Sequence, residues 1–187
     1  KNEFIETKKL LYTHPDVFHG IMEHLTQTTI AYLDMQIRAG VEVIQLFESW
    51  SGALSRNDYI LHCLSYVERI IEHVKQKVPV IFFMGTGSHL ISDVSQLLKP
   101  NVLSVDWRMD LKQASELCDK KQMALQGNLD PFVLFASKEV IQQKTRECLQ
   151  VGAAHQSGYI FNLGHGILPD TPFEKVKFLV DYVKCQK

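Results

Sequence analysis

The sequence predicts an α/β fold built on a parallel sheet, and two observations lead to this prediction. Short and almost entirely apolar runs recur along the chain, and a segment with helical periodicity follows each of them. The loops after these runs carry Gly, Ser, Asp or Asn, whereas no low-complexity linker divides the chain. Repeated strand-then-helix units indicate parallel strands with right-handed crossovers. We therefore expect residues 1–187 to form a single α/β unit.

The expected elements follow one another in a regular order. Strands are expected over 41–47, 79–84, 102–105, 123–126 and 159–162. Helices are expected over 4–12, 15–39, 58–75, 89–98, 111–120, 138–151 and 173–184. Gly40 is expected to be the C-cap of the second helix. Before the last helix we expect Asp170 or Thr171 as N-cap and Pro172 as the first helical residue.

About five strands suit either of two architectures. An open doubly wound sheet has this pattern, and so does the later part of an eight-stranded barrel. A complete barrel takes about 250 residues, which is more than this chain has. Periodicity does not choose between the two, but both place ligands at the carboxyl ends of the strands.

Composition narrows the class of protein. Hydrophobic residues make up 45% and charged residues 22% of the 187 residues, which is ordinary for a soluble globular protein. The formal net charge of -1 and the lack of a basic run argue against nucleic-acid binding. We find neither a signal peptide nor an apolar segment of membrane-spanning length, and expect a cytoplasmic protein. The chain begins at Lys1 without a methionine, so we expect it to be a piece of something longer.

The cysteines are scattered and form no Cys-x-x-Cys pair. This spacing argues against a disulfide framework and against a compact zinc site. We expect reduced thiols and no metal.

The most informative string is NLGHGILPDTP at residues 162–172, which follows the last expected strand. It places His165 between Gly164 and Gly166, where glycine removes side-chain cover and permits unusual backbone angles. We expect the imidazole to project into a cleft. The alternative is a turn whose histidine only satisfies local hydrogen bonds.

Polar residues follow the first expected strand in the string LFESWSG at residues 46–52. Ser49 is a candidate substrate-binding group or a helix cap. Glu48 is a candidate general acid or base, or a cap of a neighbouring loop. The Gly-x-Ser-x-Gly elbow of a serine nucleophile is absent.

The later strand ends offer weaker candidates. The turn Gly85-Thr86-Gly87-Ser88 exposes backbone amides to a phosphate or carboxylate, or is a flexible turn capped by Ser88. It matches neither the dinucleotide fingerprint nor the P-loop. Asp106 is a site carboxylate or the structural partner of Arg108, and Asp130 before Pro131 is a site carboxylate or a turn or cap residue.

Four strings, taken in order, resemble those of the uroporphyrinogen decarboxylase family: LFES at 46–49, VDW at 105–107, LQGNLDP at 125–131 and NLGHGILP at 162–169. The resemblance covers essentially the whole chain. It implies the C-terminal part, about five β/α units, of a (β/α)8 TIM-type barrel that is a homodimer in full length. It also implies removal of the four acetate carboxyl groups of uroporphyrinogen III, giving coproporphyrinogen III in haem biosynthesis without metal or organic cofactor.

The resemblance assigns two site residues in this chain. Ser49 matches the family's substrate-contacting serine, His165 matches the histidine of its Gly-His-Gly loop, and Phe47 is expected to line the apolar wall. The family's central aspartate, substrate-binding arginines and active-site tyrosine belong to its N-terminal portion, about three strands, which this chain lacks. We therefore assign no catalytic residue and expect the segment alone to be inactive. The turn at 83–87 departs from the family's Lys-Gly or Lys-Asp form.

Two other functions stay open. A cobalamin-dependent methyltransferase of the same superfamily would hold zinc through a His-x-Cys pair and a distant cysteine, whereas the corresponding strand end here contains Met84 to Gly87. A non-catalytic half-barrel that binds tetrapyrroles would need only the intact strand ends.

Overall fold

A computed structural model describes residues 4–186 of the chain. The strands are β1 (Ile44–Glu48), β2 (Val80–Met84), β3 (Val102–Val105), β4 (Ala124–Leu129) and β5 (Tyr159–Leu163). The α-helices are α1 (Ile5–Thr13), α2 (Pro15–Arg38), α3 (Arg56–His62), α4 (Leu64–Lys75), α5 (Ile91–Leu97), α6 (Leu111–Asp119), α7 (Lys138–Ala154) and α8 (Phe173–Lys184). Short 3-10 turns occur at η1 (Ser51–Ala53), η2 (Ser88–Leu90) and η3 (Pro131–Phe135). All five expected strands are present, but β1 begins at Ile44 instead of Val41, and β4 extends to Leu129, three residues beyond its expected end.

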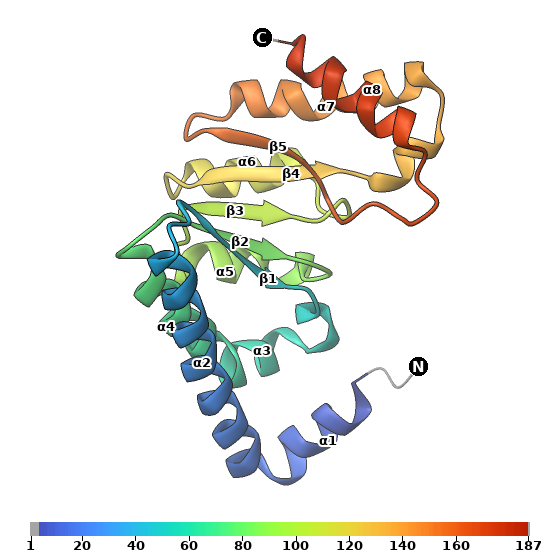
Figure 1. Cartoon of the computed structure of the whole chain (residues 1–187). Helices are drawn as coiled ribbons and strands as arrows, with labels where there is room; N and C mark the ends of the chain where they lie inside the picture. The colour runs from blue at the N-terminus through green and yellow to red at the C-terminus, as the bar shows by residue number, and fades with distance from the viewer. Residues whose placement is uncertain (1–3, 187) are drawn as a thin grey trace.

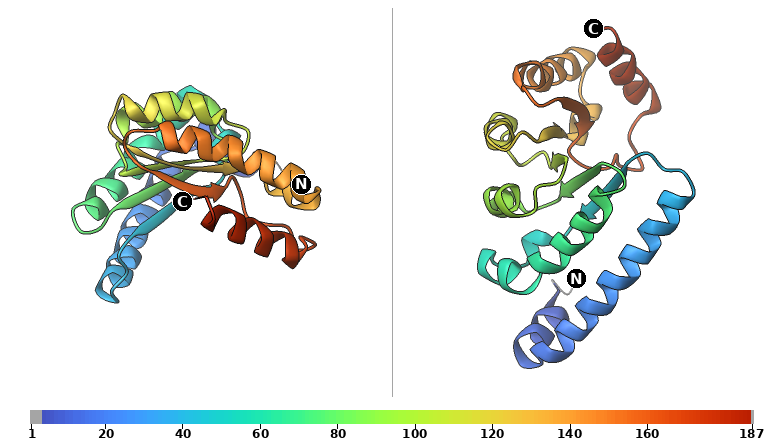
Figure 2. Two further views of the ribbon diagram at one scale, coloured as in Figure 1. Left: turned by 90° about the horizontal axis from the view of Figure 1, so that it is seen from above. Right: turned by 90° about the vertical axis from the view of Figure 1, so that its left-hand side faces the viewer.

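The five strands form one parallel sheet in the order β1-β2-β3-β4-β5 (Figure 1). The order follows the chain without the reversal that defines a doubly wound sheet. The right-hand view of Figure 2 shows α4, α5, α6 and α7 following one another along one side of the strands. Sequential parallel strands with helices outside them are the arrangement of a (β/α)8 barrel segment, which confirms the expected fold class.

Burial explains why β2 is a continuous apolar run and why β3 has Ser104 as its one polar residue. Every residue of β2 and β3 is buried, because each strand is paired on both edges and the main hydrophobic core packs against them. On β5 more and less exposed residues alternate. Within the described residues β5 pairs with β4 alone.

A polar layer interrupts this core where three strands face one another. The side-chain amide of Gln126 on β4 donates to the hydroxyl of Ser104 on β3 at 2.9 Å and to the Gln45 carbonyl oxygen on β1 at 3.4 Å. Because burying an amide without a partner costs free energy, these residues fix one another's orientation. Gln45 also lines the cavity described below.

Three details of the expected helices are wrong. The helix expected over 58–75 is two helices, because the backbone of Cys63 leaves helical geometry at φ −122°. Tyr59 of α3 and Ile71 of α4 are both buried on either side of this break. The C-cap of α2 is Ala39, and Gly40 lies one residue beyond it with φ +98°.

The third error concerns the start of α8. Pro172, with extended backbone, is the N-cap, and Phe173 is the first helical residue. The hydroxyl of Thr171 is not a cap, because it accepts the backbone N–H of Leu168 at 3.0 Å in the preceding turn. Asp170 lies in the same turn, ahead of the cap position.

None of the helices between residues 4 and 186 combines the length and the apolar character that crossing a bilayer requires.

Candidate functional site

The carboxyl ends of four strands surround two adjoining cavities. The larger, of about 400 Å³, is lined by residues in and after β1 and β5 together with Phe83 of β2. The smaller, of about 190 Å³, is lined by the loops after β1, β2 and β3 and by His165 after β5. Ser49, Phe83 and His165 line both cavities. The fold therefore brings Ser49 and His165 together, although they are far apart in the sequence.

Ser49 is half-buried at the end of β1. The N-cap of η1 is Trp50, and α3 is capped by the hydroxyl of Ser55, so the alternative of Ser49 as a helix cap is wrong. Phe47 of β1 precedes Ser49 by two residues and lines the same cavity, as expected if the alternation of the strand continues into the turn. Its ring lies 5.7 Å from the ring of Phe83, edge to face. Together the two rings give the cavity an apolar wall beside a hydroxyl group.

His165 is exposed and lies against Trp107 of the β3–α6 loop. The two rings are 5.8 Å apart at an angle of 89°, which is an edge-to-face contact. Gly164 makes this approach possible, because a Cβ there would lie 2.3 Å from the backbone nitrogen of Trp107. Neither Gly164 nor Gly166 has a positive φ, and a Cβ on Gly166 would meet nothing within 4 Å. The expected role of unusual backbone angles is therefore wrong, and only one of the two glycines is required sterically.

Asp106 organises the loops after β2 and β3. Its buried carboxylate accepts the backbone N–H of Thr86 at 2.8 Å, the backbone N–H of Arg108 at 2.9 Å and the guanidinium of Arg108 at 2.8 Å. The predicted ion pair is thus confirmed. The guanidinium carbon of Arg108 also lies 3.8 Å from the centre of the Trp107 ring. From β4, the buried side-chain amide of Asn128 donates to the Asp106 carbonyl at 2.8 Å and holds this loop in place.

The turn after β2 packs against the loops that follow β1 and β3. Thr86 adopts φ +56°, an uncommon conformation for a β-branched residue. Its backbone N–H donates to the Asp106 carboxylate and is therefore not free to bind the phosphate or carboxylate of a ligand. A Cβ on Gly87 would lie 2.3 Å from the Ser51 hydroxyl of the neighbouring loop. The cap of the following 3-10 turn is Gly87, so the prediction that Ser88 caps it is wrong.

The remaining strand-end carboxylates lie elsewhere. Glu48 faces the helices and lines a separate pocket with Tyr59, whose hydroxyl donates to it at 3.5 Å. Burial raises the pKa of the Glu48 carboxyl. Asp130 accepts the backbone N–H of Phe132 at 2.9 Å and caps η3, which confirms the expectation of a cap residue.

Among residues 4–186, no group of three or more His, Cys, Asp or Glu side chains is arranged to hold a metal ion. All four cysteines are free thiols. Burial raises the pKa of Cys63 to about 11 and that of Cys118 to about 12, so both resist ionisation.

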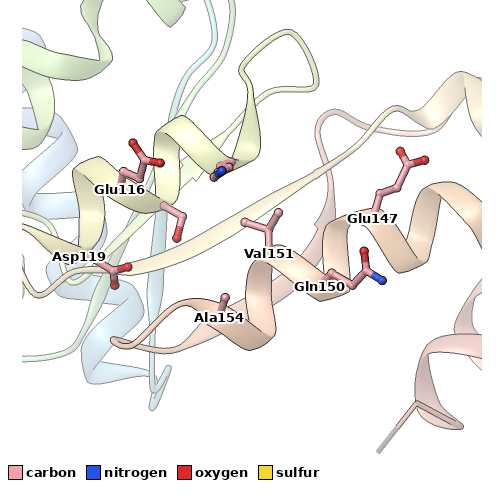
Figure 3. Close-up of a pocket in the computed structure, with 8 residues that line it drawn as sticks. Glu116, Asp119, Glu147, Gln150, Val151 and Ala154 are labelled. Carbon is pink, nitrogen blue, oxygen red and sulfur yellow. The ribbon is translucent and has the colours of Figure 1, made fainter.

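A further groove of about 440 Å³ lies between α6 and α7, outside the sheet (Figure 3). Glu116 and Asp119 reach it from α6, and Glu147, Gln150, Val151 and Ala154 from α7. Beneath it, the fully buried ring of His155 has Nδ1 2.9 Å from both Ser115 Oγ and Asp119 Oδ1, and its Nε2 is 2.9 Å from the Met123 carbonyl. Both ring nitrogens are engaged within the fold, so we assign His155 to packing between the two helices.

Sequence reasoning missed three residues of the strand-end cavities and their loops. Trp107 and Asn128 belong to the strings VDW and LQGNLDP, but only the contacts with His165 and with the Asp106 carbonyl reveal what each does. Gln45 precedes the LFES string and carries no signal beyond a polar residue in an apolar strand.

Comparison with protein families gives a match over nearly the whole chain. The profile described as Uroporphyrinogen decarboxylase (URO-D) matches residues 1–185. The uroporphyrinogen decarboxylase of Thermodesulfovibrio yellowstonii is 43% identical over 181 residues, covering 97% of this chain and 52% of that protein. The protein of the same name from Aquifex aeolicus is 41% identical over 184 residues, covering 97% and 53%. The chain thus spans about half the length of the curated relatives it matches.

Among solved structures, a methyltransferase from Methanosarcina mazei superposes with a TM-score of 0.80. The match covers 95% of this chain and 52% of that chain at 22% sequence identity. At this identity the likeness supports the fold alone.

Proposed function

Because this chain belongs to the uroporphyrinogen decarboxylase family, we propose that the full-length protein converts uroporphyrinogen III to coproporphyrinogen III. It removes the four acetate carboxyl groups as carbon dioxide, without a cofactor. In this proposal residues 1–187, acting as one α/β unit, supply part of the active-site cleft.

One observation carries the proposal at the level of the site. Ser49 and His165 come from the ends of β1 and β5 and line the same cavities, next to the rings of Phe47 and Phe83. A tetrapyrrole presents apolar pyrrole rings with acetate and propionate side chains. An aromatic wall suits the rings, whereas a hydroxyl group and an imidazole suit the carboxylates. We assign substrate binding to Ser49 and His165.

The proposed reaction needs groups from this chain and groups from the rest of the protein. A pyrrole is protonated next to the acetate-bearing carbon, and the resulting cation accepts the electrons released when carbon dioxide leaves. A proton then adds to the exocyclic carbon, and the proton taken up by the ring is released, so that one proton replaces each carbon dioxide. Such a path needs a carboxylate near the pyrrole N–H groups to stabilise the developing positive charge. Among the residues that line either cavity, the one carboxylate is that of Asp106 in the smaller cavity, and it is bonded to the backbone of Thr86 and to the guanidinium of Arg108. The family resemblance implies that the central aspartate and the tyrosine lie in the N-terminal portion outside this chain. In this proposal the chain's own residues bind and orient the substrate.

The test is a comparison of two polypeptides under anaerobic conditions. The full-length protein and residues 1–187 are each incubated with uroporphyrinogen III, and carboxylate loss is followed by chromatography. We expect coproporphyrinogen III from the full-length protein and none from the segment. Lack of product from the full-length protein, with tetrapyrrole still bound, would replace the decarboxylase by a non-catalytic tetrapyrrole-binding protein. Turnover by the segment alone would refute the claim that groups outside it are required.

The proposal extends to assembly and location. We propose that the full-length protein is a homodimer in the cytoplasm, as expected for the family. Light scattering after size-exclusion chromatography tests the first point, since a monomeric mass at micromolar concentration would contradict it. Fractionation of cells that express the native gene tests the second, because recovery of the protein in a membrane or secreted fraction would contradict it.

A further inference from the structure

Neither Ser49 nor His165 gives the cavities a permanent positive charge, although the proposed substrate carries several carboxylates. A substrate with several carboxylates needs positive charge in its binding site. Of all the side chains that line the two strand-end cavities, only the guanidinium of Arg108 is positively charged at every physiological pH. We propose that Arg108 binds a carboxylate of the substrate at the mouth of the smaller cavity. This inference rests on the proposed function and deepens it.

The Arg108 guanidinium is held in place from two directions. Its Nη1 donates to the buried Asp106 carboxylate at 2.8 Å, and the guanidinium carbon lies over the Trp107 ring, 3.8 Å from the ring centre. A long arginine side chain normally loses rotamer freedom when it binds a ligand. Here the ion pair and the aromatic contact have already restricted it, so a ligand meets a preorganised donor group.

The ion pair with Asp106 leaves Arg108 able to bind a second carboxylate. A guanidinium has five N–H donors in a planar fork, and within the described residues Asp106 is its one side-chain acceptor. Half of the Arg108 side chain is exposed, whereas only 2% of the Asp106 side chain is. Asp106 also accepts two backbone N–H groups. A ligand therefore meets the cation and not the anion of this pair.

Trp107 connects this group to the residue that the family resemblance assigned. Arg108 lies over the face of the Trp107 ring, and His165 contacts the same ring edge to face. Ser49 lines the same cavity from the β1 side. Carboxylates spaced around a macrocycle can therefore contact Arg108, His165 and Ser49 at the same time, which no small monocarboxylate can do.

Three variants of the full-length protein test the assignment. Arg108→Gln removes the charge but keeps a side-chain amide that can donate to Asp106. Arg108→Lys keeps the charge but loses the planar fork and the contact of the guanidinium with the Trp107 ring. Arg146→Gln is the matched control, since Arg146 is exposed on α7 and lines neither cavity.

Two measurements are made on each variant: kcat and KM with uroporphyrinogen III, and the dissociation constant of uroporphyrin, a stable oxidised octacarboxylate, from fluorescence quenching. Losing one charge-assisted hydrogen bond should weaken binding roughly tenfold. We expect Arg108→Gln to raise KM and Kd roughly tenfold and to leave kcat within about twofold of the wild type. The KM and Kd of Arg108→Lys should lie between those of Arg108→Gln and the wild type, whereas Arg146→Gln should match the wild type.

The outcomes separate this inference from the proposed function. If the wild type shows no turnover but binds uroporphyrin, and Arg108→Gln weakens that binding, the decarboxylase proposal fails while the carboxylate site stands. If Arg108→Gln and Arg108→Lys leave both KM and Kd at wild-type values, Arg108 has only a structural role. If the wild type neither turns over uroporphyrinogen nor binds uroporphyrin, both proposals are wrong.

Discussion

Replacing each of the glycines beside His165 by alanine should have opposite effects, because the structure places them in different surroundings. In Gly164→Ala the new Cβ would lie 2.3 Å from the backbone nitrogen of Trp107 and 2.9 Å from its Cα. Both are backbone atoms, so one loop must move by about 1 Å to reach the 3.4 Å at which ordinary contact begins. In Gly166→Ala the new Cβ would meet nothing within 4 Å.

The magnitudes follow from two terms. Forcing an extra carbon into a tightly packed contact costs about 1–3 kcal/mol. Replacing glycine by alanine also restricts the unfolded chain, which stabilises the fold by about 0.4–1 kcal/mol where the backbone conformation permits it. The second term is common to both variants. We therefore expect Gly164→Ala to be less stable than Gly166→Ala by about 1–3 kcal/mol, and Gly166→Ala to equal or exceed the wild type.

Urea unfolding of both variants and the wild type gives the free energies by linear extrapolation, and equal slopes show that the comparison is valid. Turnover is measured on the same preparations, since a displacement of about 1 Å at His165 should lower the rate up to about 100-fold in Gly164→Ala. Equal stability of the two alanine variants within about 0.5 kcal/mol would refute the steric reasoning, as would a larger loss in Gly166→Ala.

Three further predictions concern single side chains. His165→Ala should lower kcat/KM at least tenfold yet change the free energy of unfolding by less than about 0.5 kcal/mol, because the ring is exposed; normal kinetics with a lower melting temperature would contradict this. Burial raises the pKa of the Glu48 carboxyl above that of the unfolded chain, so its contribution to stability is present below the unfolded-state pKa and is lost as the pH rises through the folded-state pKa. As the pH rises from 4 to 7, the unfolding midpoint of the wild type should therefore fall relative to that of Glu48→Gln. Parallel curves of midpoint against pH for the two proteins would argue against the reasoning. A thiol reagent at about pH 8 should label the exposed Cys185 long before Cys118, whose pKa burial raises to about 12; mass spectrometry of the labelled protein gives the order, and labelling of Cys118 at a comparable rate would overturn it.

The sequence predicted the elements well, because their signals are local. The apolar run of β2, the mostly apolar run of β3 and the proline at the start of α2 can be read directly from the sequence. Strand order and helix placement are not local, so the choice between a doubly wound sheet and a barrel segment needed the structure. The break at Cys63 was missed because helical periodicity continues through it, and only the burial of Tyr59 reveals the change of direction.

The residues of the candidate site were likewise predictable only in part. Ser49 and His165 were found because distinctive strings surround them, although their shared cavity is a property of the fold. The steric need for Gly164 and the contact of Arg108 with Trp107 depend on the distance between neighbouring loops. No spacing in the sequence encodes such a distance.

The sheet separates the two kinds of loop completely, and this has a practical consequence. Every residue that lines the two strand-end cavities lies in a strand or in a loop that leaves its carboxyl end. The loops that enter the strands at the opposite end contain Lys99 and Gln122, both with positive φ. That end is a natural location for an affinity tag, a fluorescent label or a surface linkage, because a change there leaves the residues of the two cavities in place. Glycine at Lys99 or Gln122 would relieve backbone strain without altering the chemistry of the other end.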